Sequence, residues 1–362
     1  GTDMLYLPCN QLEMLSKYIG ARAEDGTLKL SRMGGAEWKT AKTRVKAATK
    51  EMAKELIKLY AERQRKEGFA FLCDDDMQRE FETAFEYEET EGQLQAIKEV
   101  KKDMETARPM DRLLCGDVGF GKTEVALRAA FKAVESGKQV AVLVPTTILA
   151  LQHYQTFAQR MRGFPVTVDM LSRFKSQKQQ AESLRRLKRG ETDIIIGTHR
   201  IVSKDVQFND LGLVIIDEEQ RFGVATKEKL KQLAGNVDVL TLSATPIPRT
   251  LNMAMSGIRD MSMLEEAPVD RVPVQTYVLE YDDNIVSDAI NRELNRGGQV
   301  FYLHNRIERA DEIVSKLSSM APDARIVSAN GRMDKDQLSD IWKDMLSGDI
   351  DILVSTTIIE SG

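Results

Sequence analysis

The strongest chemical signal in the sequence is a glycine-rich segment that ends in a lysine and a threonine. Residues 116–123 read Gly-Asp-Val-Gly-Phe-Gly-Lys-Thr and match the phosphate-binding pattern G-x-x-x-x-G-K-[ST]. An apolar run precedes them and a helical stretch follows, so backbone N–H groups would point at phosphate oxygens beside a helix N-terminus. Lys122 would contact the β and γ phosphates of a nucleotide and Thr123 would hold Mg²⁺. The alternative is a glycine-rich turn that binds nothing.

A second candidate site is a carboxylate cluster, Asp217, Glu218, Glu219 and Gln220, which follows the apolar run 213–216. A parallel strand delivers the residues after its C-terminus to the crevice where ligands bind. We therefore expect Asp217 to anchor Mg²⁺ and Glu218 to polarise an attacking water. Without the upstream loop, a solvated acidic turn would explain these residues as well.

A third candidate segment, residues 243–250, reads Ser-Ala-Thr-Pro-Ile-Pro-Arg-Thr and again follows an apolar run. Its small hydroxylated residues could hydrogen-bond to the carboxylate turn and to a neighbouring domain. Two prolines in a turn are ordinary, so the segment is a weak signal in isolation. Its position after the other two motifs makes it informative.

The elements that would position these groups alternate, from about residue 92 onward, between helical stretches and short apolar runs. The runs are rich in Val, Ile and Leu and lack polar alternation, which is typical of strands buried on both faces of a parallel sheet. The pattern predicts βαβ units and a doubly wound α/β fold. Residues 268–273 read as a linker to a second α/β domain. The expected strands are 112–115, 139–144, 166–171, 193–196, 211–216 and 237–242, then 274–279, 299–303, 324–327 and 351–354.

Three other segments are marked by their charge or spacing. Residues 36–67 lack Gly and Pro, have apolar residues at helical spacing and carry a net charge of about +5, which predicts a long linking helix. Residues 74–91 hold nine acidic residues and one basic residue, and we interpret them as a solvated surface that contains a helix. Residues 173–189 are basic and predict a solvated helix face, with DNA contact as the alternative.

The composition excludes several classes of protein. The 362 residues are 42% hydrophobic and 30% charged, which argues against disorder and collagen. Three cysteines at unrelated spacings indicate no disulfide framework, so we expect a cytoplasmic setting, and His153 and His304 read as structural residues. No apolar run is long enough to span a bilayer. The net charge of −5 argues against nucleic-acid binding only as an average, because basic and acidic segments are separate.

The order of the motifs resembles that of superfamily 2 helicases and translocases. Phe85 to Gln93 is similar to the glutamine motif, and the three segments above are similar to motifs I, II and III. Pro145 to Ala150 and Gly197 to Arg200 are similar to motifs Ia and Ib. Residues 301–306 fall at motif IV, and residues 356–362 are similar to motif V. The fold that the resemblance implies is a RecA-like α/β lobe followed by a second, truncated RecA-like lobe.

The details narrow the resemblance to the family of bacterial transcription-repair coupling factors, with the RecG helicases as relatives. The carboxylate cluster departs from the Asp-Glu-Ala-Asp of the RNA-remodelling branch, and Arg221-Phe-Gly-Val follows it. Phe120 stands where the RecG relative more usually has Ser. The resemblance implies four parts: the end of an RNA-polymerase-interacting module at 1–35, a linking helix at 36–72, lobe 1 at 73–267 and lobe 2 at 268–362.

The resemblance implies an ATPase that moves along double-stranded DNA, acts on stalled RNA polymerase and helps to recruit nucleotide-excision-repair proteins through domains outside this chain, with no membrane partner. The implied cofactors are ATP and Mg²⁺. Glu218, Lys122 and Asp217 would carry catalysis, and Thr123 and Asp217 would hold the metal. The residues expected to bind ATP are Gln93, Gly116, Asp117, Val118, Gly119, Phe120, Gly121, Lys122 and Thr123. Gln220, Ser243 and Thr245 would couple hydrolysis to movement. Thr146, Thr147, His199, Arg249, Asn305, Arg306 and Thr356 would contact DNA, mainly at phosphates.

Two alternatives stay open. One is a RecG-type fork-remodelling helicase, and the other is a polymerase-binding adaptor whose α/β part is a nucleotide-sensing scaffold. Superfamily 2 motors also need arginines in lobe 2 that reach the γ phosphate, and no such motif occurs before Gly362. We therefore expect a fragment that binds nucleotide but turns ATP over poorly.

Overall fold

The computed structural model describes residues 40, 42–44, 66–233, 235–244, 259–269, 271–272, 274–304, 309–330, 333 and 335–356. The chain divides into two units, Gly1–Glu62 and Arg63–Gly362. In the first unit, residues 40 and 42–44 are helical and exposed, and the rest of the predicted polymerase-interacting module and linking helix lies outside the described residues.

The end of the predicted linking helix is corrected by the structure. Residues 67–75 are not helical. The Phe71 N–H donates to the Met104 carbonyl at 2.9 Å, and the Phe71 ring is buried in the core of the large sheet. These residues therefore belong to the first α/β domain and do not continue a helix to residue 72.

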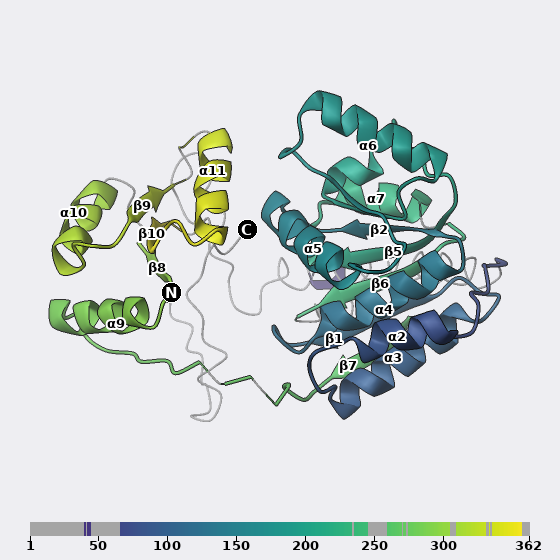
Figure 1. Cartoon of the computed structure of the whole chain (residues 1–362), viewed down its shortest axis with the longest axis horizontal. Coiled ribbons are helices and arrows are strands. Elements are labelled where there is room, and N and C mark those ends of the chain that lie inside the picture. Colours follow the sequence, from purple (N-terminus) through teal and green to yellow (C-terminus); the bar gives the residue numbers. More distant parts are fainter. Residues whose placement is uncertain are drawn as a thin grey trace. The chain divides into compact units, whose positions relative to one another are not determined.

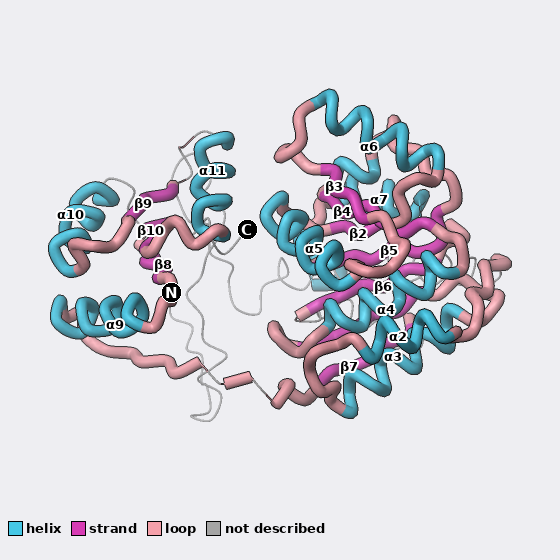
Figure 2. The backbone as a smooth tube through the Cα atoms, viewed as in Figure 1, coloured by secondary structure: helices cyan, strands magenta, loops and turns pink. Residues whose placement is uncertain are grey.

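The first α/β domain is built on a seven-stranded sheet in the order β3-β4-β2-β5-β6-β1-β7, and every pair is parallel. Figure 2 shows this order from β3 at the upper end to β7 at the lower end. Its strands are β1 (Asp111–Gly116), β2 (Gln139–Leu143), β3 (Val168–Leu171), β4 (Ile194–Gly197), β5 (Leu211–Asp217), β6 (Asp238–Ser243) and β7 (Asp260–Leu264). Its helices are α2 (Asp76–Thr83), α3 (Glu91–Met104), α4 (Lys122–Glu135), α5 (Thr147–Arg160), α6 (Gln177–Arg189) and α7 (Val224–Leu233), with the short 3₁₀ helices η2 (His199–Val202) and η3 (Glu219–Arg221).

Helices cover both faces of this sheet (Figure 1). Along β2, Val140 and Val142 join one core with residues of α3 and α4, whereas Ala141 and Leu143 join a second core with Leu187 of α6 and Leu230 of α7. Alternate residues of one strand thus bury into opposite cores, which is why the run has no polar alternation. The predicted doubly wound fold is confirmed.

The second α/β domain has a three-stranded parallel sheet in the order β8-β10-β9. The elements are α9 (Asp283–Asn295), β8 (Val300–Leu303), α10 (Ala310–Met320), β9 (Ile326–Ala329), α11 (Lys335–Leu346) and β10 (Ile352–Ser355). Ile352 and Val354 face α9 and α10, and Leu353 packs with Met345 of α11. This domain also carries helices on both faces of its sheet.

One strand prediction is wrong, and one strand was not predicted. Residues 274–279 form no strand, and Val274 and Val278 are about nine-tenths exposed because no described strand pairs with them. Strand β7 was not predicted, because Asp260-Met-Ser-Met-Leu lacks a continuous apolar run. It forms at the edge of the large sheet by pairing with β1.

The acidic segment 74–91 contains the predicted helix, α2, but it is not simply a solvated surface. Asp74 pairs with Lys101 and with Lys132, each at 2.7–2.8 Å. Glu82 pairs with Lys101, and Glu89 pairs with Arg128 at 2.6 Å. The carboxylates therefore fasten the segment onto α3 and α4. Among the described residues, no helix is long and apolar enough to cross a membrane.

Candidate active site

The three predicted motifs converge because β5, β6 and β1 are neighbours in the sheet (Figures 1 and 2). In the register, Asp217 at the end of β5 lies opposite Leu242, and Ser243 at the end of β6 lies opposite Cys115 of β1. All three strands are parallel, so their following residues leave the sheet at the same edge. The fold thus brings together groups that are up to 127 residues apart in the chain.

The glycine-rich loop has the backbone shape that the pattern requires. Gly119 and Gly121 have φ values of 82° and 78°, in the left-handed region that favours glycine. Gly121 is the N-cap of α4 and provides no side chain to cap it. A Cβ atom at Gly121 would lie only 2.3 Å from Nε2 of Gln93. The first N–H groups of α4 thus face a site suited to an anion.

Lys122 lies across the mouth of this loop. Its Nζ donates to the carbonyls of Gly116 at 2.6 Å and Asp117 at 2.9 Å. Burial lowers the pKa of Lys122, and the carboxylates of Asp217 and Glu218 act in the opposite direction. The ammonium group therefore lies within electrostatic reach of both carboxylates, where it could counter the charge of a phosphate chain.

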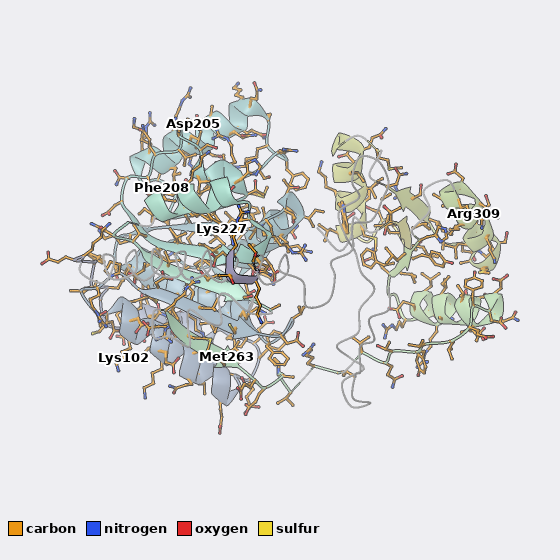
Figure 3. All side chains as sticks on the ribbon, turned by 180° about the vertical axis from the view of Figure 1, so that it is seen from behind. Lys102, Asp205, Phe208, Lys227, Met263 and Arg309 are labelled. Atoms are coloured by element: carbon orange, nitrogen blue, oxygen red, sulfur yellow. The ribbon has the colours of Figure 1, made fainter. Side chains whose placement is uncertain are left out.

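Each acidic side chain of the cluster has its own partner. Asp217 Oδ2 lies 2.9 Å from His153 Nε2, whereas Glu218 accepts a short hydrogen bond from Gln220. Glu219 instead pairs with Arg259 at 3.3 Å and with Lys227, labelled in Figure 3, at 3.9 Å. The three carboxylates are therefore aimed in different directions and are not interchangeable.

Glu218 also has an unusual backbone. Its φ of 52° makes it the one non-glycine residue with positive φ in the described part of the chain. A glutamate in this region is strained by about 1 kcal/mol or more. Strain of this kind is found at sites where a side chain must be held in one direction, which supports a special role for Glu218.

The donor set at the strand ends is compatible with Mg²⁺. Thr123 and Asp217 line one cavity together with Lys122 and Glu218. A hydroxyl and a carboxylate are oxygen ligands, and Mg²⁺ in nucleotide sites takes one or two such protein ligands along with phosphate and water. Within the described ranges, no cluster of three His, Cys, Asp or Glu side chains could hold a metal without such help.

Gln93 lies beside the loop, and its side-chain amide makes two hydrogen bonds within the protein that a residue expected only to bind the nucleotide base would not need. Its Oε1 accepts from the Thr90 N–H at 3.0 Å, closing a capping box on α3, and its Nε2 donates to the Phe120 carbonyl at 2.9 Å. Gln93 also lines a cavity of about 620 Å³ with Phe85 and Tyr87. It therefore holds the loop in place as well as facing a cavity large enough to admit a nucleotide base.

Two further groups at the site were missed by the sequence reasoning. His153 was interpreted as an ordinary structural residue, yet it contacts the Mg²⁺ candidate Asp217. Arg271, in the predicted linker, pairs with Asp117 at 3.4 Å, and its guanidinium lies 4.9 Å from the centre of the Phe120 ring. No spacing rule connects these pairs, since their members are 64 and 154 residues apart.

The residues predicted to contact DNA, and the coupling residues Ser243 and Thr245, are only partly placed. Thr146 caps α5 by accepting from the Leu149 N–H, and Thr147 begins that helix. His199 is exposed at the start of η2, next to Arg200, which forms a two-bond pair with Asp205 (labelled in Figure 3). Ser243 is buried, and Thr356 follows β10. Thr245, Arg249, Asn305 and Arg306 lie outside the described residues.

The basic segment 173–189 largely forms the predicted helix, α6. Arg185 pairs with Glu182, and Arg186 and Arg189 lie 4.0 and 3.6 Å from Glu191. Lys175 turns inward to Asp169. Much of the charge is thus neutralised within the helix and its flanks, which favours the solvated helix face over a dedicated DNA contact.

Comparison with known families and proteins gives a consistent picture. Residues 90–254 match the DEAD/DEAH box helicase model, and residues 283–362 match the helicase conserved C-terminal domain. The chain is 56% identical over all 362 residues to the transcription-repair-coupling factor of Bacillus subtilis (strain 168), and 52% identical to that of Staphylococcus aureus (strain USA300). It spans 31% of the length of each. The resemblance drawn from the motifs is confirmed.

Solved structures agree on the architecture. RecG bound to a three-way DNA junction superposes with a TM-score of 0.67 at 34% identity, covering 84% of this chain and 42% of that one. The Mycobacterium smegmatis helicase Lhr, bound to single-stranded DNA and AMP-PNP, has a TM-score of 0.56 at 18% identity over 79% of this chain and 42% of its own. The second likeness supports the fold alone.

Proposed function

Since the chain belongs to the helicases that pair a DEAD/DEAH box domain with a helicase conserved C-terminal domain, we propose that it is the motor of an ATP-dependent double-stranded DNA translocase. The motor acts on stalled RNA polymerase in transcription-coupled DNA repair. The observation that carries the ATPase part is the convergence of the glycine loop, Asp217 and Glu218 at the carboxyl ends of β1 and β5, the two strands that flank β6. The repair role is supported by 56% identity to a transcription-repair-coupling factor over the whole chain.

Each group at this edge has a proposed task. The loop N–H groups and Lys122 bind the phosphates, and Thr123 and Asp217 hold Mg²⁺, which neutralises phosphate charge when bound. Glu218, held in a strained backbone beside Gln220, accepts a proton from the attacking water. Gln93 and the 620 Å³ cavity receive the base.

The remaining predicted residues form the mechanical part of the proposal. Three residues couple ATP hydrolysis to movement of the second domain. They are Gln220, Thr245 and Ser243, which lies at the end of β6 between β1 and β5. Thr146, Thr147 and His199 contact DNA phosphates from the edge of the first domain, and the other proposed contacts are Arg249, Asn305, Arg306 and Thr356. The proposed domain limits are 1–35, 36–72, 73–267 and 268–362. Because residues 67–75 are not helical, the boundary at residue 72 moves back to about residue 66.

Nucleotide binding tests the proposal on this chain directly. Lys122→Met removes the ammonium group, and we expect the Kd for ATP with Mg²⁺ to rise by about tenfold or more, since one charge-assisted contact is worth about 1.5–3 kcal/mol. Lys138→Met is the matched control, because Lys138 pairs with Asp210 away from the loop. Isothermal titration calorimetry measures both. An unchanged Kd for Lys122→Met would remove the phosphate-loop assignment.

A RecG-type fork-remodelling helicase is the second candidate, favoured by the 34% identity and TM-score of 0.67 to RecG on a three-way junction. Capture of core RNA polymerase by the immobilised 362-residue chain separates the two, with RecG immobilised in parallel. Polymerase retained by this chain and not by RecG supports the repair-coupling role. Polymerase on neither, with three-way junctions bound more tightly than duplex, supports the RecG-type role.

A further inference from the structure

His153 forms a direct connection between helix α5 and the carboxylate end of β5. It lies on α5, seven residues after the cap Thr146, and its Nε2 is 2.9 Å from Oδ2 of Asp217. The two side chains are only 8% and 16% exposed, so water competes little for this hydrogen bond. The contact therefore ties a helix to one particular oxygen of one particular carboxylate.

The contact uses only one of the two ring nitrogens. Nε2 faces the Asp217 carboxylate, which accepts a hydrogen bond. Nδ1 is buried and has no hydrogen-bond partner among the described residues. A buried polar atom without a partner destabilises the fold, so packing alone gives no reason to have an imidazole here. The same ring lines the cavity that holds Lys122 and Thr123.

The N-terminal end of α5 belongs to the proposed DNA-contacting part of the mechanism. Thr146 and Thr147 begin this helix, and both are proposed to contact DNA phosphates. A helix moves as a stiff element, so a shift at its first turn is carried to His153 two turns later. Asp217 stands on β5, which is paired to β2, the strand that leads into α5.

We propose that His153 is a positioning residue that holds the Asp217 carboxylate ready for the nucleotide-bound Mg²⁺ and couples that metal site to the DNA-facing end of α5. The proposal rests on the proposed function. His153 occupies Oδ2 and leaves Oδ1 for the cation. Groups that orient a metal ligand in this way commonly change metal affinity by about 10–100-fold when they are removed.

The test uses Mn²⁺ as a spectroscopic substitute for Mg²⁺. Electron paramagnetic resonance of free Mn²⁺ gives its Kd in the complex of the 362-residue chain with ADP, and calorimetry in EDTA gives the metal-free Kd for ADP. His153→Leu removes the donor at similar volume, and we expect the Mn²⁺ Kd to rise about tenfold or more while the metal-free ADP Kd stays within about twofold. His153→Gln, which keeps an N–H donor, should recover most of the loss. Gln155→Leu, at an exposed position of the same helix, is the matched control.

The coupling has its own readout. Duplex DNA should change the Mn²⁺ Kd of the wild-type chain, and by linkage Mn²⁺–ADP should change the DNA Kd by the same factor. In His153→Leu that factor should fall towards one. If His153→Leu does not fold, His153→Asn, which is polar but too short to reach Asp217 from the same backbone, replaces it.

The outcomes distinguish failure of the His153 proposal from failure of the proposed function. An unchanged Mn²⁺ Kd in His153→Leu, or an equal loss of metal-free and metal-bound ADP affinity, would overturn the positioning role. An unchanged coupling factor would overturn the link to α5. A wild-type chain that binds no ADP under either condition would instead overturn the proposed function itself.

Discussion

The two parallel sheets of this protein carry their chemistry very differently. At the carboxyl edge of the large sheet, Asp217 and Glu219 have partners on distant elements, Glu218 has Gln220 as its partner in the same turn, and the strands beneath are buried. At the same edge of the small sheet, His304 Nε2 and Ser355 Oγ are buried without hydrogen-bond partners among the described residues. The large sheet thus builds a site from its own residues, whereas in the described part of the small sheet these two strand-end atoms have no such partners.

The difference extends to the strands themselves. The residues of β2 and β4 are all buried, but β8 alternates, with Phe301 and Leu303 about half exposed. A strand buried on both faces is fixed in register by both cores, while an alternating edge strand is fixed by one. We infer that the first domain determines the geometry of the proposed nucleotide site.

The largest expected contrast is in core packing. Phe131 is fully buried and stacks on Phe81 with ring centres 4.2 Å apart. Phe131→Ala should lower the free energy of unfolding by about 3–5 kcal/mol, because it leaves a cavity in the larger core. Phe301→Ala, in the half-exposed strand, should cost below about 1.5 kcal/mol. Urea unfolding followed by circular dichroism measures both. Equal losses would mean that the two sheets are equally well packed.

How far the sequence predicts the fold is clearest from the strands. Nine of the ten predicted runs coincide with or overlap an observed strand, namely β1 to β6 and β8 to β10. The clearest are β2, β4 and β5, where Val, Ile and Leu dominate because the strand is buried on both faces. Residues 274–279 also contain Val and Leu, mixed with Gln, Thr and Tyr, yet composition cannot tell whether a partner strand is present. Strand β7 was missed for the opposite reason, since pairing with β1 forms it although Asp and Ser interrupt its apolar residues.

The site shows a similar limit. The glycine loop, Asp217 and Glu218 were predictable because each motif is local in sequence and strand ends gather at one edge. His153 was interpreted as structural because its partner is 64 residues away, and contacts between distant helices and strands leave no spacing signal. Gln93 was predicted at the site, but its bond to the Phe120 carbonyl depends on the loop conformation.

The ion pairs that fasten the acidic segment should give the next largest effect. Lys132 is almost fully buried and donates to Asp74 at 2.8 Å and Glu105 at 2.7 Å. These contacts raise the pKa of Lys132, against the effect of burial. Lys132→Met leaves two carboxylates without their shared partner and should cost about 2 kcal/mol of unfolding free energy.

Arg296→Ala in the second domain is the matched control, because Arg296 is exposed and water screens its pair with Glu293, so its loss should barely change stability. Both variants are compared by urea unfolding. A cost for Lys132→Met no greater than that of Arg296→Ala would show that the acidic segment is not fastened by these contacts.

The smallest expected effect is a pH dependence near the same segment. Burial, together with the negative charge and hydrogen bond of Asp75, raises the pKa of Glu135 from 4.5 to about 7. The folded state then binds this proton more tightly than the unfolded state, so stability is full below about pH 4.5 and falls as pH rises towards 7. Because Glu135 is partly exposed, the fall should be below about 1 kcal/mol.

Glu135→Gln should remove that fall and leave the rest of the pH profile unchanged in thermal unfolding between pH 5 and about 8. In the second domain, the pKa of Tyr302 is raised to about 12 by burial and by Tyr281, so it does not titrate in this range. A wild-type profile identical to that of Glu135→Gln would contradict the raised pKa.

The most direct test of the central claim, that the carboxyl edge of the large sheet is a site of ATP hydrolysis, is the turnover of Glu218→Gln in the full-length protein with duplex DNA. Loss of a general base should lower turnover by about 100-fold or more, while the Kd for ATP stays within about threefold. Glu219→Gln is the matched neighbour, because Glu219 pairs with Arg259 and Lys227 instead, and it should lose far less. Unchanged turnover in Glu218→Gln would contradict the account.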